Sequence, residues 1–184
     1  MRLVLVRHPA PLVGPGICYG SSDLEVHPAA LEAALAALPA QLSVDARPTP
    51  IYTSPLRRCA LLAEALAARM QAAPPLADAR LAEMDFGAWE GKAWNDIPRA
   101  EVDAWADDLV HYAPGGGETV LQVAARVSAF LDECENDAIV ICHAGTIRLL
   151  TALSRPGVSL EAAALSAAST PYRIDYAAVC ILHF

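Results

Sequence analysis

Short apolar runs that alternate with helical stretches constrain the fold of this chain more than any other feature. Residues 3–6 (LVLV), 50–53 (PIYT) and 138–142 (AIVIC) are β-rich and too short to be helices. The stretches 29–42 and 56–70 are rich in Ala and Leu, which favours helix, and helical or amphipathic patterns recur at 120–131 and 146–153. Residues 172–184 predict two further strands. This alternation predicts an α/β fold: a three-layer α/β/α sandwich with a mostly parallel central sheet.

Length and composition limit the kind of protein. A chain of 184 residues fits one domain, and no linker or repeat divides residues 1–184. Its 55% hydrophobic and 18% charged residues are typical of a globular protein. The net charge of -8 argues against nucleic acid or an anionic membrane as a partner. No apolar run approaches the roughly 20 residues that span a bilayer, and the run at 3–6 is too short for a secretory signal.

The five cysteines are odd in number and form no CxxC pair. This pattern is typical of free thiols in a reducing compartment and predicts a cytoplasmic protein. The neighbours Cys142 and His143 could in principle bind zinc, but no second ligand pair stands at metal spacing. We therefore interpret the cysteines as structural and expect no metal.

Polar and cationic side chains follow three of the predicted strands. These residues are Arg7, His8, Ser54, Arg57, Arg58 and His143. In open α/β sheets, ligands bind beyond the carboxyl ends of the strands. A lone histidine or a pair of arginines at a helix start is more often solvated or structural, but cations after three separate strands favour a shared pocket. The sequence thus predicts a cationic, phosphate-binding pocket in an acidic protein.

Five ordered motifs resemble the histidine phosphatase superfamily, also called phosphoglycerate mutase-like. The motifs are LVRHP, YTSPLRRCA, LAEMDFGAWEG, GGGET and ICHAGTIR, and they span most of the chain from residue 3 to about 150. The resemblance implies the phosphoglycerate mutase-like fold. The stretches RHPAPLVGPGICYGSSDL and EMDFGAWEG are most similar to the alpha-ribazole phosphatase-like branch, which is associated with cobalamin assembly.

The resemblance implies a phosphohistidine mechanism. His8 would attack phosphorus, and Arg7 and Arg58 would bind the phosphoryl oxygens, for which a guanidinium has matched donors. Arg58 is chosen because the family's arginine lies two positions after the leucine of SPLxR. His143 would be protonated and stabilise the transferring group. Glu83 would protonate the leaving alkoxide and then accept a proton from water.

No cofactor or metal is implied, because Arg7, Arg58 and His143 would supply the positive charge. Tyr19, Asp23 and Trp89 are candidates for substrate choice, although a tryptophan in FGAWEG is at least as often packed under a loop. The GGGET segment is interpreted as a helix start, since it lacks the lysine of a P-loop.

Two family positions depart from the usual pattern. Pro9 stands where glycine is commoner, and Ser21 stands where this branch often carries a basic residue. Pro9 offers no backbone NH to a phosphate oxygen. Whether the two residues alter specificity is left open.

The predicted function is hydrolysis of a small soluble phosphomonoester, with alpha-ribazole phosphate as one substrate that the resemblance suggests. One alternative is mutase-type phosphoryl transfer in the same pocket. A short chain with little room for a capping insertion after Glu83 favours hydrolysis over it. Another is a non-catalytic phospho-ligand binding protein, against which the presence of His8 and Glu83 argues. A homo-oligomer is left open.

Overall fold

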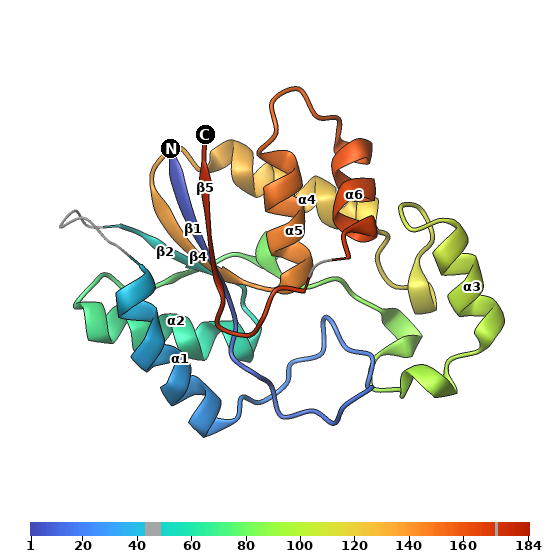
Figure 1. The fold of residues 1–184 in the computed structure, drawn as a ribbon, viewed down its shortest axis with the longest axis horizontal. Coiled ribbons are helices and arrows are strands. Elements are labelled where there is room, and N and C mark those ends of the chain that lie inside the picture. The colour runs from blue at the N-terminus through green and yellow to red at the C-terminus, as the bar shows by residue number, and fades with distance from the viewer. Residues whose placement is uncertain (43–48, 172) are drawn as a thin grey trace.

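A five-stranded mixed sheet forms the centre of the computed structural model, which describes residues 1–42, 49–171 and 173–184 (Figure 1). The strand order is β3-β2-β4-β1-β5. The four strands β1 to β4 run parallel, and β5 runs antiparallel to β1. Their bounds are β1 Arg2–Arg7, β2 Ile51–Thr53, β3 Leu76–Ala77, β4 Ala138–Cys142 and β5 Val179–His183. The prediction of a mostly parallel sheet is confirmed.

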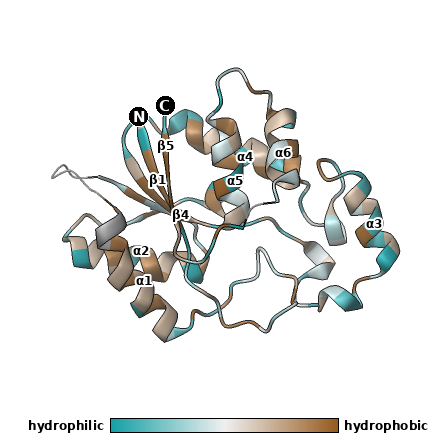
Figure 2. Cartoon of the chain, viewed as in Figure 1, coloured by the Kyte–Doolittle hydropathy of each residue, from teal (hydrophilic) through white to brown (hydrophobic). Residues whose placement is uncertain are grey.

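Alternating side chains of the central strands build a core on each face of the sheet. Leu3 and Leu5 of β1 pack with the helices α4, α5 and α6, whereas Val4 and Val6 pack with α1 and α2. This is the period-2 pattern of a strand that is buried on both faces. Figure 2 shows the apolar colour concentrated on the strands and on the helix faces next to them. The three-layer prediction is confirmed.

Helices α1, α2, α4 and α5 match the predicted stretches closely, whereas α3 and α6 were not predicted. Their bounds are α1 Pro28–Gln41, α2 Arg57–Met70, α3 Arg99–Asp107, α4 Val120–Glu133, α5 Ala144–Leu153 and α6 Leu160–Ser169. GGGET starts α4 as expected, because the Thr119 side chain and Gln122 form a capping box. Within the part of the chain described, no helix is long and apolar enough to cross a membrane.

The prediction of two strands near the C-terminus is wrong for the first of them. Among residues 173–184, only β5 is a strand, and residues 173–178 lead into it through a turn. Ala177 has φ 59°, which is the left-handed region and is incompatible with an extended strand. Residue 172, at the start of the predicted pair, lies outside the described residues.

Residues 85–118 form a lobe beside the sandwich, seen at the right of Figure 1. The lobe contains α3 and three short 3-10 turns, Gly87–Trp89, Trp94–Asp96 and Pro114–Gly116. Its core is a separate cluster built around Cys18, Trp89 and Ile97. The expectation that the chain has little room after Glu83 is therefore wrong, because a lobe with its own apolar cluster follows that residue.

Candidate active site

The parallel strands bring the predicted site residues to one edge of the sheet. β1 and β4 are neighbours in register, with Arg7 opposite Cys142, so both strands end at the same level. The amide of His8 donates to the carbonyl of Cys142 at 3.0 Å. The rings of His8 and His143 consequently lie 5.0 Å apart between centroids. The two histidines are 135 residues apart in sequence and adjacent in space.

His8 is held as a neutral imidazole with one defined tautomer. Its ring is 2% exposed, and Nδ1 lies 2.7 Å from the carbonyl oxygen of Pro9. A carbonyl can only accept, so Nδ1 carries the proton and Nε2 carries the lone pair. Burial and the positive charge of Arg58 lower the pKa of His8 to about 3. At pH 7 the free nitrogen is available as a nucleophile.

His143 is fully buried where α5 begins. Its Nδ1 accepts from Nε of Arg58 at 3.3 Å, and its Nε2 lies 2.8 Å from the hydroxyl of Ser54. An arginine can only donate, so Nδ1 is unprotonated. Burial and the nearby His8 and Arg58 lower the pKa of His143 well below its usual value. These surroundings favour neutral His143 when no phosphoryl group is bound, whereas the negative charge of a bound anion would raise its pKa. The protonated state expected during phosphoryl transfer stays a prediction.

The two adjacent arginines of α2 point to different surroundings. Arg58 is completely buried and donates from Nε to His143, from Nη1 to the carbonyl of Ser22 at 2.7 Å, and from Nη2 to the carbonyl of Gly20. Each Nη carries two hydrogens, so one on each nitrogen remains for another acceptor. Arg57 instead forms an exposed ion pair with Glu25. The geometry agrees with the choice of Arg58 for the site.

Arg7 lies over an aromatic ring that sequence reasoning missed. Its guanidinium carbon is 4.0 Å from the ring centroid of Tyr176, and Nη1 donates to the carbonyl of Ile174. Its Nε is buried and has no hydrogen-bond partner among the described residues. The hydroxyl of Tyr176 meets the hydroxyl of Tyr19 at 2.9 Å, and the Tyr19 ring lies 5.7 Å from the guanidinium of Arg58. The tyrosine pair therefore connects the surroundings of the two arginines.

Glu83 reaches the same edge of the sheet from the segment that follows β3. Its Oε2 accepts from the amide of Gly145 at 3.2 Å, two residues after His143 and in the first turn of α5. A Cβ atom on Gly145 would lie 2.4 Å from Oε1 of Glu83, so a side chain at this position would displace the Glu83 carboxyl group.

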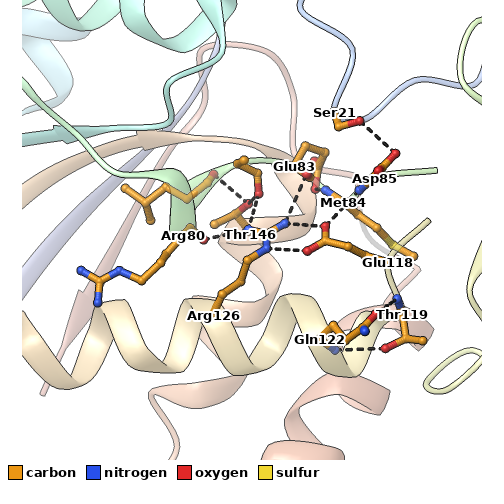
Figure 3. Close-up of polar contacts among 12 residues, drawn as sticks. Ser21, Arg80, Glu83, Met84, Asp85, Glu118, Thr119, Gln122, Arg126 and Thr146 are labelled. Carbon is orange, nitrogen blue, oxygen red and sulfur yellow. Dashed lines mark hydrogen bonds and ion pairs between the residues drawn. The ribbon is translucent and has the colours of Figure 1, made fainter. Parts of the chain in front are cut away.

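Arg126 of α4 fixes the irregular segment that carries Glu83 (Figure 3). Its guanidinium donates to the carbonyls of Arg80, Ala82 and Glu83 at 2.7–3.2 Å. It also forms a two-bond pair with Glu118, at 2.9 Å for each bond. One side chain thus satisfies three backbone carbonyls, one in the 3-10 turn Ala79–Leu81 and two in the residues after it, which restrains the position of Glu83.

Glu90 fixes the loop that contacts Arg58. Its carboxylate accepts from the amides of Gly20, Ser21 and Ser22 at 2.9–3.2 Å and from the amide of Phe86 at 3.1 Å. Burial alone would raise the pKa of Glu90, but the hydrogen bonds from Ser22 and these amides outweigh it and lower the pKa. The carbonyls of Gly20 and Ser22 are then presented to Arg58. Glu90 is a positioning residue for that arginine.

The three candidates for substrate choice lie in different places. Tyr19 is beside Arg58 as described above. Asp23 accepts from the amide of Arg57 at 2.7 Å, which caps the start of α2. Trp89 is 1% exposed inside the lobe, where its indole donates to Glu101 at 2.7 Å, so the structure does not bring it to the histidines. Its packing corresponds to the alternative interpretation, a tryptophan under a loop.

Pro9 and Ser21, the two residues that depart from the family pattern, each form a hydrogen bond near the site. Pro9 supplies the carbonyl that fixes the tautomer of His8. Ser21 donates to Asp85 at 3.0 Å, which joins its loop to the segment after Glu83 (Figure 3).

The cysteines form no disulfide bonds in the structure. All five cysteines are free, and burial raises the pKa of Cys59 and Cys142. Among the residues that the structure describes, no group of three or more His, Cys, Asp or Glu side chains is placed to hold a metal ion.

Sequence reasoning missed Tyr176, Glu90 and Arg126: no quoted motif contains Tyr176 or Arg126, and Glu90 lies in FGAWEG without a role assigned to it. The sequence signals that exist are weak: an aromatic residue before the last strand, an acid within FGAWEG, and an arginine on the apolar-patterned helix α4. Each acts through a partner more than 30 residues away, such as Tyr176 on Arg7.

A three-layer α/β fold that gathers two histidines, two arginines and a carboxylate at the carboxyl edge of its sheet defines a class of enzymes that act on phosphate esters. Comparison with models of protein families identifies one such class. The chain belongs to the histidine phosphatase superfamily (branch 1), whose model matches residues 3–184.

Relatives and solved structures agree with this assignment. The Hydrogenobacter thermophilus protein named "Putative phosphoserine phosphatase 2" is 29% identical over 168 residues, which are 87% of this chain and 81% of that protein. The mycobacterial glucosyl-3-phosphoglycerate phosphatase is 28% identical with a TM-score of 0.71, covering 89% of this chain and 83% of that one. The alpha-ribazole phosphatase from Shigella flexneri has a TM-score of 0.80 over 98% of this chain and 89% of its own, and at 24% identity it shows the shared fold.

Proposed function

We propose that the protein is a metal-independent phosphomonoesterase that hydrolyses a small phosphate ester through a phosphohistidine at His8. In the first step, the lone pair of His8 Nε2 forms a bond to phosphorus while the ester P–O bond breaks. Glu83 gives its proton to the departing alkoxide. In the second step, a water oxygen bonds to phosphorus, Glu83 takes the proton, and the N–P bond breaks. Arg7 and Arg58 stabilise the charge on the phosphoryl oxygens in both steps.

The tautomer and charge of His8 carry this proposal. A nucleophilic imidazole must be neutral and must present a nitrogen lone pair. The bond of Nδ1 to the carbonyl of Pro9 and the pKa of about 3 meet both conditions at pH 7. A histidine with only a structural role would have no need for two flanking arginines, which make its protonation still less favourable.

The comparisons support phosphate esters as the substrate class but favour no single ester. The relatives reported above are named as phosphatases that act on different esters, and the superfamily match covers nearly the whole chain. Alpha-ribazole phosphate stays a candidate from the sequence resemblance, since the structural likeness to alpha-ribazole phosphatase concerns the fold. A place in the cytoplasm stays a prediction from the free cysteines.

Mutase-type transfer is the second candidate. It uses the same phosphohistidine but returns the phosphoryl group to an alcohol, and the lobe at residues 85–118 removes the earlier argument against it. Hydrolysis in the presence of an added alcohol separates the two: a phosphatase yields inorganic phosphate, whereas a mutase yields mainly the new ester. A binding protein would yield neither.

Rapid acid-free quenching with ³²P-labelled p-nitrophenyl phosphate tests the covalent step. We expect alkali-stable, acid-labile label on the native protein and none on His8→Ala. The matched control is His183→Ala, since His183 is exposed on β5 and pairs opposite Arg2, at the other end of the sheet. Label or substantial turnover in a folded His8→Ala protein would contradict the assignment of the nucleophile.

A further inference from the structure

Glu83 borders an apolar cavity of about 310 Å³, and neither His8 nor His143 is among the residues that line it. Its wall combines the sandwich helices α4, α5 and α6 with the lobe. Apart from Tyr19, Glu83 and Arg148, it is lined by apolar side chains and by Gly145; the apolar residues include Met84, Phe86, Trp105, Leu109, Val123 and Leu149. A cavity of this volume lies in the range of small-molecule sites, and about twice the volume of one that holds benzene.

The cavity is continuous with the proposed reaction centre through two residues. Glu83 lies on its wall and also contacts Gly145 of α5, next to His143. Tyr19 lies on its wall and also against Arg58. A phosphoryl group between the arginines and His8, with its leaving oxygen toward Glu83, therefore directs the alcohol portion of the ester into this cavity.

The chemistry of the wall favours one kind of alcohol. Phe86 and Trp105 meet edge to face, with their ring centroids 5.9 Å apart, and both border the cavity. The indole Nε1 of Trp105 is buried and, within the described ranges, has no hydrogen-bond partner. A polar alcohol such as a sugar or an amino acid would lose hydration on this surface without regaining hydrogen bonds for most of its hydroxyl or amino groups.

We propose that this cavity is the leaving-group site and that it selects phosphate esters of alcohols bearing a bulky apolar group, an aromatic ring system above all. This inference rests on the proposed phosphatase function and narrows its substrate class.

Esters of primary alcohols of similar basicity isolate the contribution of the cavity. The series is ethyl phosphate, 2-phenylethyl phosphate and 2-(1-naphthyl)ethyl phosphate, with phosphoserine as the polar comparator. Burying one phenyl ring removes about 100 Å² of apolar surface from water, so kcat/KM should rise about ten- to a hundredfold from ethyl to phenylethyl. We expect a further rise for the naphthyl ester and a low value for phosphoserine.

Two matched variants on α6 test whether this cavity is responsible. Ala168 lines the cavity, and Ala168→Phe fills part of it. Ala162 is exposed on the same helix and outside the cavity wall, so Ala162→Phe makes the same change elsewhere. Ala168→Phe should lower the naphthyl-to-ethyl ratio of kcat/KM at least tenfold, and Ala162→Phe should leave that ratio as in the native protein.

Binding to His8→Ala protein, measured by calorimetry for the same esters, reports the cavity without turnover. The inference is supported when the naphthyl ester binds more tightly than the ethyl ester and Ala168→Phe removes the difference. Equal affinities, or a preference that Ala168→Phe leaves intact, would overturn it. A different result would contradict the proposed function itself: hydrolysis that persists in His8→Ala.

Discussion

Glu90→Gln changes one atom in the loop that presents carbonyls to Arg58, and its effect can be calculated from the contacts. Oε1 accepts from the amides of Ser21 and Phe86, and Oε2 accepts from the amides of Gly20 and Ser22. Whichever oxygen becomes an NH₂ group, two backbone N–H donors then face another donor. The substitution keeps the size of the side chain, so packing is preserved while the hydrogen bonds are lost.

The cost follows from these two unsatisfied amides. A buried donor left without an acceptor costs about 1–3 kcal/mol, and loss of the charge weakens the remaining bonds. Glu90 is only partly buried, so water can satisfy part of the lost bonding. We expect a loss of about 2–3 kcal/mol in the free energy of unfolding, which corresponds to a decrease in Tm of about 4–12 °C for a chain of this size.

Activity should fall as well, because the carbonyls of Gly20 and Ser22 hold the Arg58 guanidinium. A displacement of about 1 Å in a group that binds the phosphoryl oxygens can cost up to about a hundredfold. At 20 °C, where the variant is folded, kcat/KM for p-nitrophenyl phosphate should fall about ten- to a hundredfold. Urea unfolding and steady-state kinetics on the same preparations provide both measurements.

Glu101→Gln is the matched control. Glu101 accepts one hydrogen bond, from the indole of Trp89, and a glutamine carbonyl can accept it equally well. Its free energy of unfolding should change by less than about 1 kcal/mol, and its activity should stay native. If Glu90→Gln matches this control in both measurements, the loop does not position Arg58 and the reasoning fails.

Three further predictions concern the chemistry of the site. Glu83→Gln should slow pre-steady-state phosphorylation by an alkyl phosphate about 10²- to 10⁴-fold but slow p-nitrophenyl phosphate much less, because only the alkoxide needs a proton to leave; equal losses would mean that Glu83 only positions the pocket. The pKa of His8 is about 3 in the folded state and 6.5 in the unfolded state, so between these two pH values the unfolded state binds more protons. The free energy of unfolding therefore falls as the pH is lowered from 6.5 toward 3. Urea unfolding of His8→Gln should depend on pH less steeply than that of the native protein, by about 1.4 kcal/mol per unit in that window, and identical slopes would contradict the shift. Because Arg7 and Arg58 supply the charge, dialysis against EDTA should leave the rate unchanged, whereas a loss restored by magnesium or zinc would indicate another mechanism.

The strand ends were predictable because their signal is local. Apolar runs that end in Arg7, in SPLRR and in His143 indicate parallel strands, and the parallel topology then brings those residues together. The same pattern predicted the three layers. The choice between Arg57 and Arg58, however, came from the family resemblance, since helix propensity treats the two alike.

Other features depend on contacts that no short pattern contains. Glu90 and Arg126 each satisfy several backbone groups of distant segments, and nothing in their neighbours announces this. The protonation of His143 depends on complete burial beside Arg58, which only the packed structure reveals. The missing C-terminal strand has a similar cause, because the left-handed Ala177 follows Tyr176, whose ring packs against Arg7.

The position of β1 in the sheet has a consequence for biosynthesis. Of the five strands β1 is made first, but its neighbours β4 and β5 begin at residues 138 and 179, so β1 lacks its first partner until more than 130 further residues have been translated. During that time its apolar edges lack partners, which is a condition that favours aggregation and recruits chaperones. Tyr176, which lies against Arg7, is also made late. A ribosome-bound chain stalled before residue 138 should therefore lack both the sheet centre and the assembled site, even though every residue up to Glu83 has already been synthesised.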